Sequence, residues 1–418
     1  MSIRVYPWLI VSPLPPFSAF RFRAFRFCLR LPLLPRFIPF HPIALERIAR
    51  PLPLCQTRPV NIPYQPALPE KGFPIVIIGT GGIVKDAHLP AYRMAGFTVD
   101  TLVNRTVERA RELATQYSIP KVFSTTQEAV ANAPRDAIFD IALPASMFAA
   151  TLRELPDGAH VLIQKPMGET LAQAREILEV CRQKNLQAAI NCQLRFAPFV
   201  MAARHLIDTG VIGQLTDMEM RLTCFMPWHL WTFLYDLPRM EILYHSVHYV
   251  DLVRSFLGQP TGVQALTLPH PNAPRLASTS TAILMNYASG VRATITTNHN
   301  HNFGPRHQES YLKWEGTKGA IWAQVGLLMD YPKGVGDAFE FCVREEGREP
   351  EWKSVKLEGS WFPEAFVGTM ASVQRHKEGS DATMPTSVED VIHTMECVEA
   401  AYVASQQGGV PPVTAFSK

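Results

Sequence analysis

Apolar runs of strand length alternate with helical stretches between residues 73 and 191. The runs predict strands at 75–78, 98–103, 122–123, 137–143, 161–163 and 188–191. Segments with a helical spacing of apolar residues separate them, at about 86–95, 107–117 (with Thr106 as its cap), 126 onward, 147–154 and 171–184. Parallel neighbours in a sheet need a crossover, which a helix usually supplies. The pattern therefore predicts an α/β fold with a doubly wound parallel sheet.

Beyond Pro198 the predicted strands follow one another without intervening helices. A helix is expected up to about residue 209 and another over 241–257, followed by strands at 262–268, 280–287, 291–297, 310–315 and 319–323. Residues 287–291 have the composition of a hairpin turn. A last helix over 387–406 begins after Ser387, which can cap it. Strands that are segregated from helices predict a second domain of the α+β class.

The glycine-rich turn after the first strand is the most informative motif. Residues 73–85, FPIVIIGTGGIVK, place three glycines between a buried strand and a helix. Glycines let the backbone approach a pyrophosphate, and the helix N-terminus attracts its negative charge. We therefore predict a dinucleotide-binding domain of the Rossmann type, although Val84 occupies the third glycine position of the fingerprint. The residues expected at the cofactor are Gly79, Thr80, Gly81, Gly82 and Ile83.

The end of the second strand indicates which dinucleotide is bound. An acidic residue there would bind the ribose 2′-hydroxyl of NAD, but this chain has Asn104 and Arg105. Arg105 can pair with a 2′-phosphate, so NADP(H) is favoured. NAD(H) is the alternative, because Arg105 could also stack on the adenine. Pro144 and Arg195 follow the fourth and sixth strands and are expected on the cofactor side and the substrate side of the cleft.

Charge is spread unevenly along the chain. The formal net charge is +3, yet residues 1–70 hold nine arginines, no lysine and only two acids, so the remainder is net negative. No basic tract suited to nucleic acid follows residue 70. Prolines exclude long helices from residues 1–70, and arginines interrupt every apolar run before it could span a membrane. This segment has the composition of a transit peptide or of a disordered extension.

Seven cysteines are scattered without a CxxC pair, which is typical of reduced thiols inside a cell. We therefore expect a cytoplasmic protein, with organellar import as the alternative if residues 1–70 are a transit segment. Neither nucleic acid nor a membrane is an expected partner.

Several motifs occur in the order found in one enzyme family. They are GTGGIVKDAHLPAY (79–92), HVLIQKPMG (160–168), QLRFAP (193–198), DTGVIGQL (208–215), SVHYVDLVRSFLG (246–258) and EGTKGAI (315–321). Over residues 73–412 the chain resembles the Gfo/Idh/MocA family of nicotinamide-dependent oxidoreductases. The resemblance implies a Rossmann domain, followed by an α+β domain with an open, largely antiparallel sheet. The expected segments are an extension (1–70), a dinucleotide-binding domain (71–196) and a substrate-binding and oligomerisation domain (197–418).

The resemblance also implies which residues carry the chemistry. Lys165 matches the family's lysine beside the nicotinamide, where its charge would stabilise a developing alkoxide. His248 matches the catalytic histidine, which exchanges a proton with the substrate hydroxyl. Two departures stand nearby: Gln164 replaces the usual glutamate, and Tyr244 replaces a common aspartate one turn before the histidine. Gln164 is expected at the cofactor, and Tyr244 as an assisting donor or acid.

Histidines and other polar residues are dense in the second domain. We interpret them as the lining of a pocket for a polyol or a sugar-like substrate, with Trp228 stacked on its apolar face. One alternative is a polar loop at the sheet edge. Another is a Zn²⁺ site, but no HExxH or other closed ligand spacing is present, so no metal is expected. The expected substrate ligands are Arg195, Trp228, His245, His299, His301 and Arg306.

These observations predict an NAD(P)-dependent dehydrogenase or reductase that acts on CH–OH groups of a sugar, a polyol or a related small molecule. One alternative is a dinucleotide-binding sensor of the same fold that has lost turnover. Another is a redox-assisted lyase or glycosidase, in which hydride returns to the substrate. Retention of both Lys165 and His248 argues against the sensor. The resemblance also implies a homo-oligomer, a dimer or tetramer that buries the open sheet face.

Overall fold

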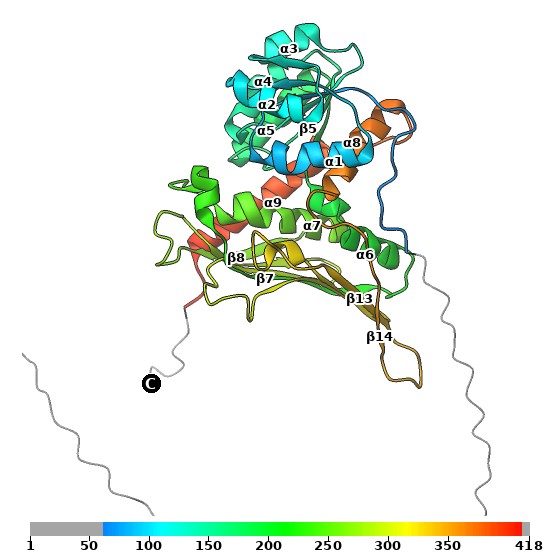
Figure 1. The fold of residues 1–418 in the computed structure, drawn as a ribbon. Coiled ribbons are helices and arrows are strands. Elements are labelled where there is room, and N and C mark those ends of the chain that lie inside the picture. The colour runs from blue at the N-terminus through cyan, green and yellow to red at the C-terminus, as the bar shows by residue number, and fades with distance from the viewer. Residues whose placement is uncertain (1–61, 412–418) are drawn as a thin grey trace, which may run out of the picture. The chain divides into compact units, whose positions relative to one another are not determined.

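The first sheet is parallel throughout. The computed structural model describes residues 62–411, and the strands of this sheet pair in the order β3-β2-β1-β4-β5-β6, with every neighbouring pair parallel (Figure 1). They are β1 (Ile75–Ile78), β2 (Val99–Val103), β3 (Lys121–Phe123), β4 (Ile138–Ile141), β5 (His160–Ile163) and β6 (Gln187–Ile190). The order reverses between β1 and β4, and ligands of such sheets bind at that point, outside the carboxyl ends of the strands. The predicted doubly wound sheet is confirmed.

Both faces of this sheet are covered. Along β1, Val76 and Ile78 belong to one hydrophobic core, whereas Ile75 and Ile77 belong to another on the opposite face. Strand side chains alternate between faces, so a strand that is apolar at every position must be buried on both. The covering helices include α1 (Leu89–Ala95), α2 (Val107–Tyr117), α3 (Thr126–Asn132), α4 (Phe148–Glu154) and α5 (Leu171–Gln183).

Two details of these helices differ from the sequence prediction. Thr106 does occupy the cap position of α2, but its side chain accepts no capping hydrogen bond. The helix predicted over 86–95 instead begins with a π-helical turn, Val84–His88, which continues into α1. Val84 is fully buried at the start of that turn.

The second sheet is mixed and mostly antiparallel. Its order is β14-β13-β12-β11-β7-β10-β9-β8, and only one neighbouring pair, β7 and β10, is parallel. The predicted α+β class with a largely antiparallel sheet is therefore confirmed. The strands are β7 (Leu215–Thr223), β8 (Gly262–Leu268), β9 (Ser280–Asn286), β10 (Arg292–Asn298), β11 (Glu309–Gly316), β12 (Gly319–Gln324), β13 (Ala338–Val343) and β14 (Trp352–Ser354).

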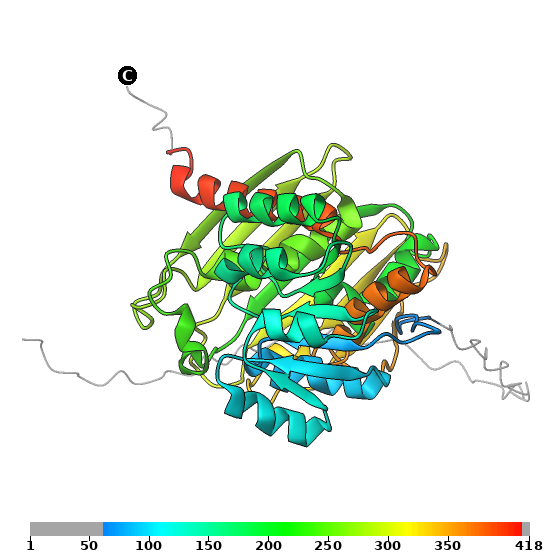
Figure 2. The ribbon, with the colours of Figure 1, turned by 90° about the horizontal axis from the view of Figure 1, so that it is seen from above.

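Helices α6 (Pro198–Asp208), α7 (Val247–Leu257) and α9 (Val388–Gln407) lie over one face of this sheet, as Figures 1 and 2 show. Alternate residues of β7 are buried, among them Met218 and Met220, and they join the core beneath the helices. Within residues 62–411 no helix is long and apolar enough to cross a membrane.

The C-terminal part of the chain returns to the first sheet through a helix that the sequence analysis missed. Helix α8 (Ala365–Glu378) places Phe366 and Met370 in the core on one face of the parallel sheet. Gln374 of the same helix donates to the carbonyl of Phe73 (3.0 Å) and accepts from its amide (2.7 Å). A division of the chain at residue 196 therefore separates the first sheet from part of its own core.

Residues 62–70, which the sequence analysis assigned to the N-terminal extension, also contact the folded chain. Ile62 is 5% exposed, and the Tyr64 hydroxyl accepts from the amide of Glu358 at 3.3 Å. Arg375 of α8 donates to the carbonyl of Leu68 at 3.3 Å. Residues 62–70 therefore belong to the folded part of the chain, and the predictions made for residues 1–61 lie outside the described residues.

Gly368 of α8 tests the close packing of that helix. A Cβ at this position would lie 2.5 Å from the Cβ of Phe196, an atom that cannot swing away. We expect Gly368→Ala to lower the free energy of unfolding by about 1–3 kcal/mol, because the overlap outweighs the gain in helix propensity of about 1 kcal/mol. Urea unfolding measures the change. Gly72→Ala, where nothing lies within 4 Å of the added Cβ, is the control and should change little. Equal stabilities of the two variants would contradict tight packing of α8.

Candidate functional site

The glycine-rich turn has the geometry of a cofactor cradle. Gly79 has φ +107° and a Cβ there would overlap the carbonyl of Ala142, so glycine is required for this turn. Gly81 and Gly82 are exposed, and nothing lies within 4 Å of a Cβ built on Gly81. The Thr80 hydroxyl is buried without a hydrogen-bond partner. Open backbone beside an unsatisfied donor fits a dinucleotide pyrophosphate, as predicted from the sequence.

The remaining predicted cofactor residues surround the carboxyl edge of the parallel sheet. Ile83 is half-buried directly after the glycines, and Pro144 is exposed after β4. Asn104 and Arg105 follow β2; Asn104 donates to the carbonyl of Thr106 at 3.0 Å, whereas Arg105 is exposed. The Arg105 side chain is therefore accessible at this strand end.

Lys165 links the first sheet to the helix that carries His248. It follows β5, is half-buried, and its Nζ donates to the backbone carbonyl of Tyr244 at 3.0 Å. Burial lowers the pKa of Lys165 to about 8, and the Cys192 thiol opposes this with a smaller raising effect. The ammonium form therefore predominates at pH 7 but is lost a short way above it.

His248 lies in the first turn of α7 and is 6% exposed. Its pKa is held well below 6.5, first by burial and then by the charge of Lys165. The ring packs edge-on against Trp361, with ring centroids 5.0 Å apart. A neutral imidazole at pH 7 can accept a proton from a hydroxyl.

Tyr244 presents two different groups to its neighbours. Its backbone carbonyl accepts from Lys165, whereas its hydroxyl donates to Glu169 at 3.4 Å. Burial, and then the charge of Glu169, raises the pKa of the phenol to about 12. Tyr244 therefore stays protonated at neutral pH, with its proton directed to a carboxylate.

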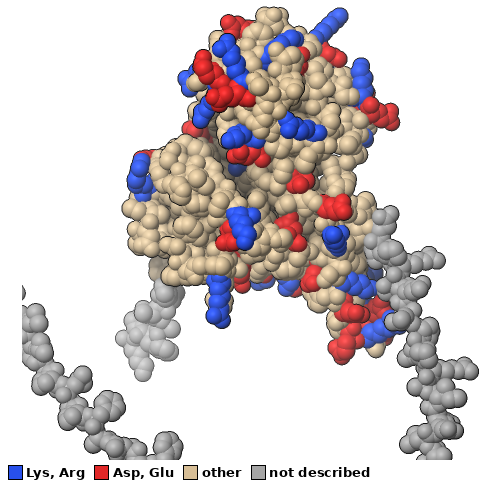
Figure 3. All heavy atoms as spheres, in the orientation of Figure 1, with Lys and Arg blue, Asp and Glu red and all other residues tan. Residues whose placement is uncertain are grey.

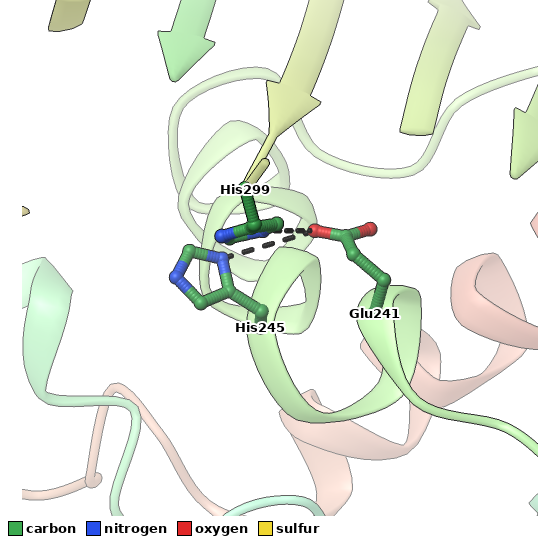
Figure 4. A group of neighbouring side chains, drawn as sticks. All are labelled: Glu241, His245 and His299. Carbon is green, nitrogen blue, oxygen red and sulfur yellow. Dashed lines mark hydrogen bonds and ion pairs between the residues drawn. The ribbon is translucent and has the colours of Figure 1, made fainter. Parts of the chain in front are cut away.

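Glu241, His245 and His299 form a cluster of side chains near Lys165 and His248 (Figure 4). Glu241 and His245 belong to the π-helical turn Glu241–Ser246 that precedes α7, and His299 follows β10. His299 Nε2 is 3.0 Å from Glu241 Oε1, and His245 Nδ1 is 3.8 Å from the same oxygen. Burial by itself would raise the pKa of Glu241, but the hydrogen bonds from His299, Thr281 and Ser246 and the charge of His299 together outweigh it, and the pKa is lowered. The Trp228 ring packs edge-on against His299 at 5.4 Å.

Three predicted substrate ligands have other surroundings. His301 Nε2 is bonded to the carbonyl of Arg306 at 2.9 Å, within the loop after β10, where Arg306 is exposed. Arg195 donates to both carboxylate oxygens of Asp251 (2.7 and 2.5 Å), to Asp390 (2.6 Å) and to the carbonyl of Pro385 (2.7 Å). These contacts use every nitrogen of the guanidinium. Arg195 therefore joins α7 to α9, and its part as a substrate ligand stays a prediction.

A buried hydrogen-bond network explains why residue 164 is glutamine. The Lys165 amide donates to Gln164 Oε1 at 2.7 Å, so the Gln164 amide group must donate to His88 Nε2, 3.3 Å away. Asn191 Nδ2 lies 3.3 Å from the same nitrogen. His88 Nε2 is thus an acceptor, and Nδ1 carries the proton that is donated to Asp140 at 2.7 Å. A glutamate at position 164 could not donate to this tautomer of His88.

Comparisons with known proteins show the family of the chain. Residues 73–192 match the oxidoreductase family with an NAD-binding Rossmann fold, and residues 200–322 match the GFO/IDH/MocA C-terminal domain. The chain belongs to the GFO/IDH/MocA oxidoreductase family. The two matched ranges together span more than half of the chain.

Relatives within the family act on sugars according to their names. The 1,5-anhydro-D-fructose reductase of Ensifer adhaerens is 25% identical over 250 residues, which are 59% of this chain and 74% of that protein. The D-apiose dehydrogenase of Paraburkholderia graminis is 24% identical over 351 residues, 81% of this chain and 89% of that protein. A solved oxidoreductase from Agrobacterium radiobacter, in complex with NAD⁺, L-tartaric acid and magnesium, has a TM-score of 0.67 at 18% identity, over 81% of this chain and 98% of that one. This last likeness shows the fold alone.

The family confirms that the protein is an NAD(P)-dependent oxidoreductase acting on CH–OH groups. Neither the non-catalytic sensor nor the redox-assisted lyase or glycosidase is supported by these relatives.

Several residues of the site could not be found by sequence analysis. Asp140 lies in the middle of β4, where a single acid in an apolar run carries no signal of its partner. Trp361 and Glu169 belong to segments without a matched family role, and they reach His248 and Tyr244 only through the tertiary fold. The one available clue was Gln164, whose departure from the family pattern indicates a changed neighbour.

The network around His88 predicts a non-additive effect on stability. We expect Gln164→Glu and Asp140→Asn each to lower the free energy of unfolding by about 1–3 kcal/mol, since each leaves a buried polar group unsatisfied. In the double variant His88 can switch tautomer, donating from Nε2 to the new carboxylate at position 164 and accepting at Nδ1 from the new amide at position 140. The combined cost should then fall short of the sum of the single costs by about 0.5–3 kcal/mol. Urea unfolding of the four proteins measures this coupling, and strictly additive costs would contradict the assigned tautomer.

Proposed function

We propose that this oxidoreductase transfers a hydride between NADP(H) and a secondary alcohol or carbonyl carbon of a sugar-like substrate. Lys165 and His248 are the proposed catalytic pair, and Tyr244 assists. The observation that carries the proposal is the hydrogen bond from Lys165 Nζ to the Tyr244 carbonyl, which joins the carboxyl edge of the parallel sheet to the turn leading into α7. The charge of Lys165 also lowers the pKa of the His248 imidazole, so we propose that both groups act beside the nicotinamide.

Each group has a distinct part in alcohol oxidation. The neutral His248 accepts the hydroxyl proton, and the Lys165 ammonium stabilises the negative charge that develops on the oxygen. The bound nicotinamide would supply the hydride acceptor. In the reductive direction His248 returns the proton. The Tyr244 hydroxyl donates its proton to Glu169, so Tyr244 assists by holding its own position beside the catalytic pair.

The substrate class is inferred from the polar groups beside this pair and from the relatives named above. His245 and His299 lie next to the catalytic residues, and Trp228 offers an apolar ring edge against His299. Such a mixture suits a ring that carries several hydroxyls. His301 and Arg306 remain proposed as loop contacts at the rim of the substrate site.

We further propose NADP(H) as the preferred cofactor, because Arg105 can pair with a 2′-phosphate and residue 104 is not acidic.

The protein is proposed to be cytoplasmic and homo-oligomeric. Its subunits would meet through the face of the second sheet that α6, α7 and α9 leave uncovered. Acidic and basic side chains are intermingled on the face drawn in Figure 3, which supports a small-molecule partner and not a nucleic acid.

Lys165 and His248 predict how activity depends on pH. With NADP⁺ and a panel of aldoses and polyols, we expect kcat/KM for oxidation to fall above about pH 8, because Lys165 loses its proton there. It should stay level down to pH values below 6.5, because His248 remains neutral. Lys165→Met should lower kcat/KM by at least about 10²-fold and abolish the alkaline fall. Lys184→Met, remote on α5's C-terminal cap, is the control. Turnover by Lys165→Met at the wild-type rate would refute the proposed catalytic pair.

Cofactor preference depends on Arg105. We expect Arg105→Ala to weaken NADPH binding by about tenfold, the loss of one charge-assisted hydrogen bond, and to weaken NADH binding far less. Titration followed by nicotinamide fluorescence measures both dissociation constants. Arg111→Ala, another exposed arginine on α2, is the matched control. An equal loss of affinity for both cofactors would contradict 2′-phosphate recognition and favour adenine stacking.

A further inference from the structure

The Glu241 carboxylate is buried without a fixed cation. The side chain is 0% exposed, and among residues 62–411 no lysine or arginine lies within ion-pair distance of it. A buried carboxylate requires a compensating charge or a full set of donors. The groups closest to it are two imidazoles, His245 and His299, together with the hydroxyls of Ser246 and Thr297.

The three strongest ligand groups in this cluster converge on one point. Glu241 Oε1, His245 Nδ1 and His299 Nε2 all lie within 4.8 Å of one another, and two of the three separations are 3.0 and 3.8 Å. Zinc ligands sit about 2.0–2.2 Å from the ion, so tetrahedral ligand atoms are separated by roughly 3.3–3.6 Å. Only small side-chain adjustments separate the observed positions from that geometry. Figure 4 shows both rings turned toward the carboxylate oxygen.

A second observation points independently to a ligand. His245 Nδ1 is buried and has no hydrogen-bond partner, although the side chain as a whole is 15% exposed. Ser246 donates to both oxygens of Glu241, at 2.9 and 3.0 Å, as the outer hydrogen bonds of a metal-binding carboxylate do. A metal ion between His245 Nδ1 and the Glu241 carboxylate would give this nitrogen the partner that it lacks.

We propose that Glu241, His245 and His299 bind one divalent transition-metal ion of the zinc type. Two imidazoles and one carboxylate form a ligand set suited to Zn²⁺ and related ions, whereas Mg²⁺ and Ca²⁺ prefer oxygen ligands alone. Three protein ligands leave a coordination position for an oxygen atom. The sequence analysis weighed a Zn²⁺ site but expected no metal, because no closed ligand spacing is present; the third ligand, His299, comes from the end of β10, 58 residues after Glu241.

The position of this site connects it to the substrate. His245 lies three residues before His248 on the same helical segment, so the open coordination position is close to the catalytic pair. A substrate hydroxyl or carbonyl oxygen would occupy it and be polarised there. This link rests on the proposed function, whereas metal binding itself does not. His245 and His299 would then act on the substrate through the ion and not by direct hydrogen bonds.

Metal content tests the proposal on the full chain. The protein is stripped with EDTA, loaded with Zn²⁺, desalted and analysed by elemental mass spectrometry; Co²⁺ loading adds a visible absorption band if the site is tetrahedral. We expect about one ion per chain, and at least about tenfold weaker binding in Glu241→Gln and His299→Gln. His229→Gln removes an exposed histidine near the cluster in sequence and should keep the ion. Circular dichroism confirms that each variant is folded.

The outcomes separate this proposal from the proposed function. Zinc retained equally by the wild-type protein and both cluster variants would overturn the site, as would a wild-type protein that retains none while NADPH binding and turnover are normal. Should the cluster variants misfold, a Zn²⁺-dependent rise in the wild-type melting temperature, unchanged in His229→Gln, still supports the site, and its absence refutes it. Stoichiometric metal binding without turnover of any sugar would support the site while the proposed reaction fails.

Discussion

The ion-paired guanidinium of Arg195 is the contact on which the position of the site depends. It follows β6 and binds Asp251 of α7 and Asp390 of α9, with Arg195 10% and Asp251 2% exposed. Asp251 is one turn beyond His248, so the same interaction that joins these helices to the parallel sheet also sets where the histidine lies relative to Lys165. Removing one partner of such a buried pair leaves an uncompensated buried charge, so breaking this attachment is strongly destabilising. The end of β6 is thereby joined to α7 and α9 by ion pairs.

Acidic groups in this protein reach the site from positions outside the family motifs. Residue 164 is glutamine and residue 244 is tyrosine, so two carboxylates common in the family are missing. Asp140 behind His88, Glu169 behind the Tyr244 hydroxyl and Glu241 beside the two histidines provide negative charge instead. None of these carboxylates pairs with Lys165, whose pKa is lowered by burial.

Local patterns predicted most of the fold, because strand and helix periodicity depend on residues close in sequence. The parallel strands, the glycine turn and helix α7 were all predicted near their observed positions. Helix α8 was missed because its apolar positions face two different partners and give a weak helical period, and β14 is too short to carry one. The ion pairs of Arg195 could not be predicted, because sequence alone does not show which carboxylates fold onto it. The convergence of Glu241 with His299 is likewise a property of the fold, because the two residues lie 58 positions apart, one before α7 and the other after β10.

The hydrogen bonds between Phe73 and Gln374 join residues that are 301 positions apart, across the base of the first parallel strand. On a ribosome, the strands of the first sheet emerge long before α8 does. The core on one face of that sheet must therefore remain open until nearly the whole chain has been made, although the sheet itself belongs to the N-terminal half. High sequence separation of this kind slows folding and prolongs the exposure of apolar surface. Apolar side chains on that face of the cofactor-binding sheet are therefore exposed until α8 has been synthesised.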